Sequence, residues 1–483
     1  MSTAEFILIV QVVFFIYFVL LNGSYLILNI IAGIRMWRVT QEREADNAPR
    51  PYEALEPPVS IIVPAFNEER SIVQTVQSLL LLNYPKYEII VVNDDSKDTT
   101  LETVIAEFGM VPFPESAEAV LESRPVRSVY QSTRFPHVRM VDKENGGKAD
   151  SLNAGINASR YPLFCCIDAD SILQRDSLQH LVKPFLDDSR TVATGGTVRV
   201  GNGCVVKDGL LISAGLPKNL LGLLQIVEYL RAFLFGRLGW APMNAMLIIS
   251  GAMGLFDKAK VIKVGGYRSD TVGEDMELVV RLHTYMSEQK TPYRIHFVPD
   301  PICWTEVPED LKTLKTQRVR WQRGLCESLM ANRELFLKLK GGAAAWVAYP
   351  FMLVFEMFGP VIELFGYIFV IVLFILGLTS FSTMMVFLMM AFGLGVLLSV
   401  TALVLEEMSF HIYPRPKHMV TLFGVAILDN FGYRQLNAMW RLVGLVKWMF
   451  GGRAKWGVMQ RKATWNKTFM DRVRKRKGAT VPR

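Results

Sequence analysis

Two carboxylates, Asp168 and Asp170, directly follow the apolar run 163–167 and are the clearest candidates for chemistry in this sequence. Such a run predicts a buried strand, and side chains at its carboxyl end lie where ligands bind in open α/β sheets. Two acids there could hold a hard divalent cation, which in turn could hold a diphosphate. Asp-x-Asp is also common in turns and helix caps, so the pair needs support from its surroundings.

Further polar residues fall at the predicted ends of neighbouring elements. They are Asp94 and Asp95 at the end of the run 87–95, Lys148 behind Gly146 and Gly147, and Glu274 with Asp275 in the segment 272–277. A Gly-Gly-Lys turn could offer backbone N–H groups and a cation to a phosphate, although the spacing of a P-loop is absent. Each group alone could be a solvated turn. Together they predict a site for a metal-bound diphosphate.

The elements that must position these residues alternate between strands and helices from residue 59 onward. We predict strands at 59–64, 87–95, 138–141 and 163–167, with helical patterns between them. This alternation indicates right-handed βαβ units, and therefore an α/β fold with a mostly parallel sheet. Residues 109–136 are rich in Pro, Ser and Arg and are predicted to form an inserted loop.

Composition favours an enzyme attached to a membrane. The 483 residues are 51% hydrophobic with a net charge of +8, and the mean hydropathy of +0.25 is high for a soluble enzyme. A basic balance fits a nucleic-acid partner or an anionic membrane surface. The five cysteines show no CxxC or Cys/His spacing, which indicates neither zinc nor a disulfide framework but a reducing, cytosol-facing compartment.

Two long stretches without charged residues predict membrane spans. Residues 6–34 exceed the ~20 apolar residues that cross a bilayer, and the arginines that follow place that end in the cytoplasm. A cleavable signal peptide fits less well because no basic region precedes the run. Residues 364–405 fit two spans joined by a turn near Gly377, whereas 419–449 suggest an amphipathic or re-entrant helix.

Two acids in the apolar segment 343–363, Glu356 and Glu363, allow two interpretations. They could line a passage inside the helix bundle, because ionisable residues at membrane depth usually face an interior or a wet cavity. They could equally lie at the water interface, where a charge costs little. The sequence does not decide between these positions.

The order of these motifs resembles the membrane-embedded glycosyltransferases of family 2, which include cellulose, chitin, hyaluronan and poly-N-acetylglucosamine synthases. The matching segments are 63–68, 92–96, 147–153, 168–170, 250–252, 273–275 and 317–321. The last contains the Gln-x-x-Arg-Trp signature at the start of a predicted interfacial helix and is the most specific. Seven motifs in the family's order are unlikely to match by chance.

The resemblance implies a role for each matching residue. It implies catalysis by Asp275 as general base with Glu274 beside it, and metal binding, as Mg²⁺ or Mn²⁺, by Asp170. Nucleotide or donor binding is implied for Pro64, Glu68, Asp94, Asp95, Lys148, Asp168, Gln317 and Arg320, and acceptor binding for Trp321, Ser250 and Gly251. Aromatic faces suit sugar C–H surfaces and arginine suits phosphate, although Trp321 could instead be an interfacial anchor.

The sequence departs from the family pattern in two places. Asp95 stands where the family has glycine, which leaves open which acid meets the nucleotide, and Gly273 replaces a threonine before the base. Near the C-terminus, Trp456, Arg461 and Lys462 resemble a gating loop that closes over UDP, but a basic tail on anionic lipid explains them almost as well.

The resemblance implies a GT-A (Rossmann-like) cytosolic domain inserted between transmembrane and interfacial helices of a multi-pass inner-membrane protein. We predict an N-terminal transmembrane helix at 1–38, a linker at 39–58, the GT-A domain at 59–308, an interfacial helix at 309–342, further transmembrane and interfacial helices at 343–450 and a basic cytosolic tail at 451–483. The expected partners are a UDP-sugar, a growing glycan or lipid acceptor and membrane lipids, and not nucleic acid.

Three functions remain open from the sequence. The first is a processive synthase that makes and exports a β-linked exopolysaccharide. The second is transfer of a single sugar to a membrane lipid, although such enzymes often lack Gln-x-x-Arg-Trp. The third is an inactive scaffold or polysaccharide receptor, which the presence of every expected acid argues against. The sugar, the linkage, the oligomeric state and any partner subunit cannot be predicted.

Overall fold

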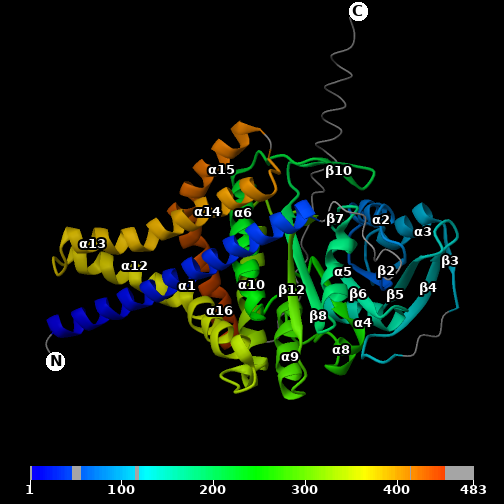
Figure 1. The fold of residues 1–483 in the computed structure, drawn as a ribbon, viewed down its shortest axis with the longest axis horizontal. Helices are drawn as coiled ribbons and strands as arrows, with labels where there is room; N and C mark the ends of the chain where they lie inside the picture. The colour runs from blue at the N-terminus through cyan, green and yellow to red at the C-terminus, as the bar shows by residue number, and fades with distance from the viewer. Residues whose placement is uncertain (1–2, 46–55, 115–118, 414, 452–483) are drawn as a thin grey trace, which may run out of the picture.

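The computed structural model describes residues 3–45, 56–114, 119–413 and 415–451 (Figure 1). A sheet domain and a group of long helices lie side by side, and the N-terminal helix α1, Thr3–Ala45, runs across the helical part. The domain is built on a ten-stranded sheet in the order β3-β4-β5-β2-β1-β6-β11-β8-β12-β7. Its strands are β1 Val59–Ala65, β2 Tyr87–Asp94, β3 Met110–Pro112, β4 Val126–Ser132, β5 Val138–Lys143, β6 Leu163–Ile167, β7 Ser171–Leu173, β8 Thr191–Val200, β11 Met253–Asp257 and β12 Arg294–Thr305.

The centre of the sheet is parallel. Strands β5, β2, β1 and β6 run side by side in one direction, with Ala65 paired to Asn93 and Ile62 to Cys166. Their β-branched and apolar residues are buried on both faces, as parallel strands covered by helices require. Because the strands share one direction, the segments that follow β1, β2 and β6 emerge at the same edge. The predicted α/β arrangement of βαβ units is present.

Antiparallel strands extend this parallel centre on both sides. Strand β11 pairs with β6 in the opposite direction, with Met253 opposite Ile167. The segment before β11 therefore lies beside the residues that follow β6. This pairing places the segment 250–252 next to Asp168.

Helices cover the sheet and form the rest of the chain. Those of the sheet domain are α2 Ile72–Leu80, α3 Thr100–Phe108, α4 Lys148–Ala158, α5 Ser177–Asp187, α8 Lys258–Lys263 and α9 Glu274–Glu288; a short hairpin, β9 Val205–Lys207 and β10 Leu210–Ser213, forms a second sheet. The remaining helices are α6 Leu220–Leu230, η1 Arg231–Arg237, α7 Leu238–Trp240, η2 Ala241–Met243, α10 Leu311–Ala331, η3 Arg333–Leu335, η4 Ala344–Ala348, α11 Tyr349–Phe351, η5 Met352–Met357, α12 Gly359–Ile375, α13 Phe381–Leu388, η6 Met389–Gly393, α14 Leu394–Ser409, α15 Pro416–Leu428, η7 Asp429–Tyr433 and α16 Arg434–Phe450.

The inserted loop predicted for residues 109–136 is wrong in part. This segment contains β3 and β4, which pair antiparallel with each other and with β5 at one end of the sheet. The segment 126–132 contains few apolar residues and is mostly exposed or half-buried, so it lacks the continuous apolar run of a buried strand.

The linker predicted for 39–58 also begins too early. Helix α1 continues to Ala45, and the Thr40 hydroxyl donates back to the Met36 carbonyl within it. No helix breaker occurs before Pro49, so the change to polar composition did not end the helix. Residues 46–55 lie outside the described part of the chain.

Apolar helices that meet the requirement for a membrane span lie in two places. Among the described residues, one helix, Glu5–Gln41, is long enough and apolar enough to cross a bilayer. The helices Ala344–Met357 and Gly359–Ile375 pass the same test together and, bent by 45°, could form a second span. Only 22% of the first helix's apolar window is buried, so its side chains are not the core of a soluble domain. The turn predicted near Gly377 separates α12 from α13. The full multi-pass topology stays a prediction.

Candidate active site

A cavity of about 890 Å³ opens at the edge where β1, β2 and β6 end. Asp94, Lys148 and Asp168 line one part of it, together with Pro64 and Glu68. Parallel strands bring these motifs together although more than 100 residues separate Pro64 from Asp168. The predicted grouping of the donor-site residues at one edge of the sheet is therefore what the structure shows.

Lys148 is the central cation of this edge. It is the first residue of α4 and follows Gly147, whose φ of 87° favours glycine. Its Nζ lies 2.5 Å from Asp168 Oδ1 and 3.6 Å from Glu274 Oε1, and it donates to the Gly251 carbonyl. Burial lowers the pKa of Lys148, but the charges of Asp168 and Glu274 outweigh it and hold the pKa above its ordinary value. The charged ammonium form of Lys148 is therefore the form available to bind a phosphate.

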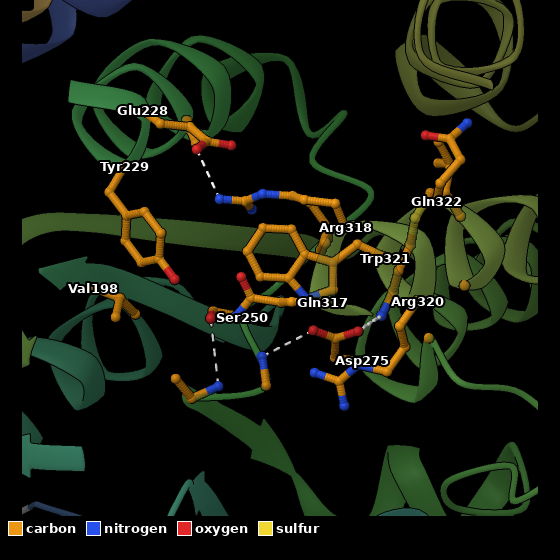
Figure 2. A pocket seen from close by; sticks show the side chains of 18 of the residues that line it. Val198, Glu228, Tyr229, Ser250, Asp275, Gln317, Arg318, Arg320, Trp321 and Gln322 are labelled. Carbon is orange, nitrogen blue, oxygen red and sulfur yellow. Dashed lines mark hydrogen bonds and ion pairs between the residues drawn. The ribbon is translucent and has the colours of Figure 1, made fainter. Parts of the chain in front are cut away.

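Asp275 is held as a hydrogen-bond acceptor at the start of α9. Its Oδ2 accepts from the Gly251 N–H at 3.0 Å, and its Oδ1 accepts from the Met276 N–H at 2.8 Å (Figure 2). A carboxylate in the first turn of a helix is also favoured by the helix dipole. Glu274 beside it is buried and faces Lys148; burial raises its pKa and Lys148 offsets part of that rise. The Asp275 carboxylate is thus fixed in the cavity lining, and its role as general base stays a prediction.

Asp94 and Asp95 point in different directions. The Asp94 carboxylate lines the cavity and accepts from the Gly146 and Gly147 N–H groups at 2.9 and 2.8 Å, and from Lys143 Nζ at 2.6 Å. It shapes the Gly-Gly-Lys turn directly, and its contact with a nucleotide stays a prediction. Asp95 instead pairs with Lys97 and Arg127 on the surface, which lowers its pKa, and it has a φ of 60° where the family has glycine.

The Asp168–Ala169–Asp170 turn offers hard oxygen ligands but no complete cage. Asp168 lines the cavity, whereas Asp170 is only 1% exposed and accepts from the Thr305 hydroxyl at 3.4 Å. Among the described residues no group of three or more metal-ligating side chains occurs. Such a set fits Mg²⁺ or Mn²⁺ that takes its remaining ligands from a diphosphate and water. Ligation by Asp170 stays a prediction.

The residues of the Gln-x-x-Arg-Trp motif line the same cavity from α10. Trp321 is 44% exposed, and Figure 2 shows it between Arg318 and Asp275 in that view. Gln317 is buried, and its Oε1 has no hydrogen-bond partner among the described residues. A buried carbonyl oxygen without a donor is costly, so a bound hydroxyl would stabilise it. Arg320 and Ser250 also line the cavity.

The cavity continues from Trp321 into the helices. Both Glu356 and Glu363 line it. Glu356 accepts from Tyr25 of α1 at 2.5 Å and from Arg441 of α16 at 2.8 Å. Arg441 also donates to Gln322, the residue after Trp321, at 2.7 Å. Polar side chains from four helical segments thus form one wall of the cavity.

Several lining residues escaped the sequence interpretation. Glu228, Tyr229 and Arg237 come from α6 and the π-helical segment η1. Burial lowers the pKa of Arg237 to about 10, and its guanidinium stacks on Phe233 at 3.8 Å. A π-helical segment often occurs at a functional site, but no residue pattern in the sequence predicts such a segment. Trp456, Arg461 and Lys462 of the predicted gating loop lie outside the described residues.

Comparison with known families agrees with this site. Residues 163–398 match the family described as glycosyl transferase family group 2, and residues 60–108 match glycosyl transferase family 2. Both descriptions name the family of glycosyltransferases that the motifs of this chain resemble. The resemblance inferred from the motifs is therefore confirmed. The matched segments contain Glu68, Asp94, Asp168 and Trp321, whereas Lys148 lies between the two segments.

Named relatives match a little over half of the chain. A poly-beta-1,6-N-acetyl-D-glucosamine synthase of Staphylococcus aureus is 30% identical over 284 residues, which are 58% of this chain and 57% of the relative. A synthase of the same name from Staphylococcus epidermidis is 28% identical over 283 residues, 58% of each chain. The match thus spans less than two thirds of these relatives' length.

A solved glycosyltransferase structure confirms the fold. The mannosyltransferase from Pyrobaculum calidifontis, in complex with GDP-Man and Mn²⁺, is 17% identical with a TM-score of 0.50. The similarity covers 91% of this chain and 99% of the mannosyltransferase. At this identity the likeness shows the fold alone, and the predicted GT-A architecture is confirmed.

Proposed function

We propose that this chain is an inverting, metal-dependent glycosyltransferase that uses a UDP-sugar to build a β-linked polysaccharide and to export it at the inner membrane. One observation carries the proposal: a single cavity joins Lys148 and Asp168, through Trp321, to the polar side chains between the helices. Transfer of one sugar to a lipid would not require polar groups such as Glu356 and Arg441 to line a passage inside the bundle.

The mechanism follows from the groups that meet at Asp275. Asp275 takes the proton from an acceptor hydroxyl as that oxygen attacks the anomeric carbon and UDP leaves from the opposite side. Direct attack is a single displacement, so an α-linked donor gives a β-linked product. Trp321 supports the acceptor sugar with its aromatic face, while Lys148 and Arg320 stabilise negative charge on the departing diphosphate. A divalent cation held at Asp168 and Asp170 would supply further positive charge there.

The first test is an assay of the full chain in detergent with a panel of UDP-sugars. UDP-N-acetylglucosamine comes first, since the staphylococcal relatives are named poly-beta-1,6-N-acetyl-D-glucosamine synthases. We expect UDP release from one donor together with a product of many sugars. A product of one sugar on lipid would favour the single-transfer alternative. A protein that releases no UDP from any donor would be a scaffold.

Removal of divalent cations tests the metal part of the proposal. Excess EDTA is expected to abolish UDP release, and added Mg²⁺ or Mn²⁺ to restore it, because a diphosphate leaving group needs its charge neutralised. Asp170→Asn should lose this restoration while the purified protein still elutes as a single species. Full activity in excess EDTA would contradict metal dependence and leave the transferase assignment standing.

A further inference from the structure

An ion pair between a buried arginine and a partly exposed glutamate lies behind the indole of Trp321. Arg318 of α10 is only 3% exposed, and its Nη2 donates to Glu228 Oε2 of α6 at 2.8 Å. The same guanidinium lies over the Trp321 ring, with its Cζ 4.4 Å from the ring centroid. Figure 2 shows Arg318 extending across Trp321 toward Glu228. The in-plane N–H groups of arginine can therefore bond Glu228 while its face covers the indole.

Among the described residues, Glu228 is the carboxylate that pairs with Arg318. Its Nε and Nη1 are buried and make no hydrogen bond within the described part of the chain. Glu228 Oε2 also accepts from the Tyr433 hydroxyl at 2.9 Å. Tyr433 directly follows Phe431 and Gly432, which leave helical geometry and kink the chain before α16. Three segments distant in sequence thus meet on one carboxylate behind Trp321.

This arrangement leaves one face of the indole for a ligand. The Arg318 guanidinium lies over the Trp321 ring, while Trp321 as a residue stays 44% exposed in the cavity. An acceptor sugar must then stack on the remaining surface of Trp321. A cation near an indole face holds the ring in place by about 1–2 kcal/mol when water is excluded. A ring that could rotate would present its acceptor surface only part of the time.

We propose that Glu228 and Tyr433 act through Arg318 as positioning residues that fix the indole of Trp321 for the acceptor sugar. The inference rests on the proposed polymer-forming function and adds residues outside the motifs that define it. Loss of the contacts among Glu228, Tyr433 and Arg318 should weaken acceptor binding more than donor binding. The ratio of polymerised sugar to released UDP should then fall, because donor that meets no ordered acceptor is lost to water.

The test compares variants of the full chain in detergent, with the UDP-sugar that gives the highest turnover. Sugar incorporated into polymer and UDP released are measured together. Glu228→Gln keeps the side-chain volume and removes the charge, and we expect the ratio to fall roughly 5- to 30-fold. Tyr433→Phe should lower it less, and Arg318→Lys should retain more polymer formation than Arg318→Met because the cation remains.

A matched control and a reference variant separate the possible outcomes. Glu288→Gln removes a comparable ion pair, with Lys338 at 2.7 Å, outside the cavity lining and should keep the wild-type ratio. Trp321→Ala should lose most polymer formation; if it does not, the proposed function fails. If Trp321→Ala behaves as expected but Glu228→Gln and Tyr433→Phe keep the wild-type ratio, the positioning inference alone is overturned. Equal loss of polymer formation and UDP release in Glu228→Gln would also overturn it.

Discussion

At the scale of single residues, the site depends on how backbone N–H groups hold its acids. Asp275 accepts from Gly251 and Met276, and Asp94 accepts from Gly146 and Gly147. Such hydrogen bonds fix the orientation of each carboxylate. Asp94 thereby shapes the turn that presents Lys148, whereas Asp275 faces the acceptor region. Removing either acid should have a different effect on the reaction.

Asp275→Asn should retain UDP binding and lose sugar transfer. A general base contributes ~10²–10⁴-fold to the rate, and the nucleotide does not contact this group in the proposed mechanism. The dissociation constant for UDP and the rate of UDP release with saturating donor would be measured on the same preparation. Asp270→Asn removes a surface ion pair with Arg268 and serves as the control. Parallel losses of UDP affinity and turnover would assign Asp275 to the donor site.

Gly251→Ala should lose activity without unfolding the protein. A Cβ at this position would lie 2.9 Å from Lys148 Nζ and 3.3 Å from Asp275 Oδ2. The flexible lysine can move aside at small cost in stability, but the displaced ammonium should reduce turnover on the order of 10²-fold. Turnover and the thermal midpoint are measured together. Gly424→Ala, with no atom within 4 Å of its Cβ, is the control. Normal turnover in Gly251→Ala would show that the close approach is not needed.

At the scale of elements, strand ends explain why much of the site could be predicted. Lys148, Asp168 and Asp275 follow or begin elements whose patterns are strong, and parallel strands place such ends at one edge. Glu228 lies 90 residues from Arg318 and 205 from Tyr433. No local sequence pattern connects positions so far apart, so the contacts of Glu228 with Arg318 and Tyr433 behind Trp321 could not be predicted. The strands in 109–136 were missed because this segment contains no continuous apolar run.

Helix α9, which carries Asp275, is attached to the sheet domain through His283. The buried imidazole contacts the Met246 carbonyl at 3.0 Å and the Tyr293 hydroxyl at 2.7 Å. Burial lowers the pKa of His283 from 6.5 to about 4. Between pH 6.5 and about pH 4, His283 therefore binds a proton more readily in the unfolded chain than in the folded one. The contribution of His283 to stability is complete above about pH 6.5 and is lost as the pH falls toward 4.

We expect acidification to pH 5 to reduce the free energy of unfolding by about 2 kcal/mol through this histidine. Thermal midpoints of the full chain in detergent at pH 7 and pH 5 would measure the change. His283→Gln cannot gain the proton, so its midpoint should fall less between the two pH values, whatever its starting stability. An identical fall in both proteins would assign the acid sensitivity to other groups.

At the scale of the whole molecule, the catalytic domain and the helices share one cavity. Apolar side chains of α1 and α12 are exposed on the outside, while Tyr25, Glu356 and Arg441 meet on the inside. A buried ion pair between Arg199 of β8 and Glu406 of α14 also joins the sheet to the helices. Breaking such a pair typically costs 3–5 kcal/mol, so the two parts are held in a fixed relation. The polar part of the cavity between the helices is therefore continuous with the candidate active site.

The most direct test asks whether the growing glycan enters the helices. A photo-cross-linking amino acid would replace either Asn437, which lines the cavity on α16, or Met439, which is 52% exposed on the same helix. Each full-length protein would receive radiolabelled donor in detergent, be irradiated, and be examined for label covalently attached to the protein. We expect labelled glycan of many sugars to be attached at position 437 and almost none at position 439. Polymer made in solution with no label at 437, or equal label at both positions, would contradict it.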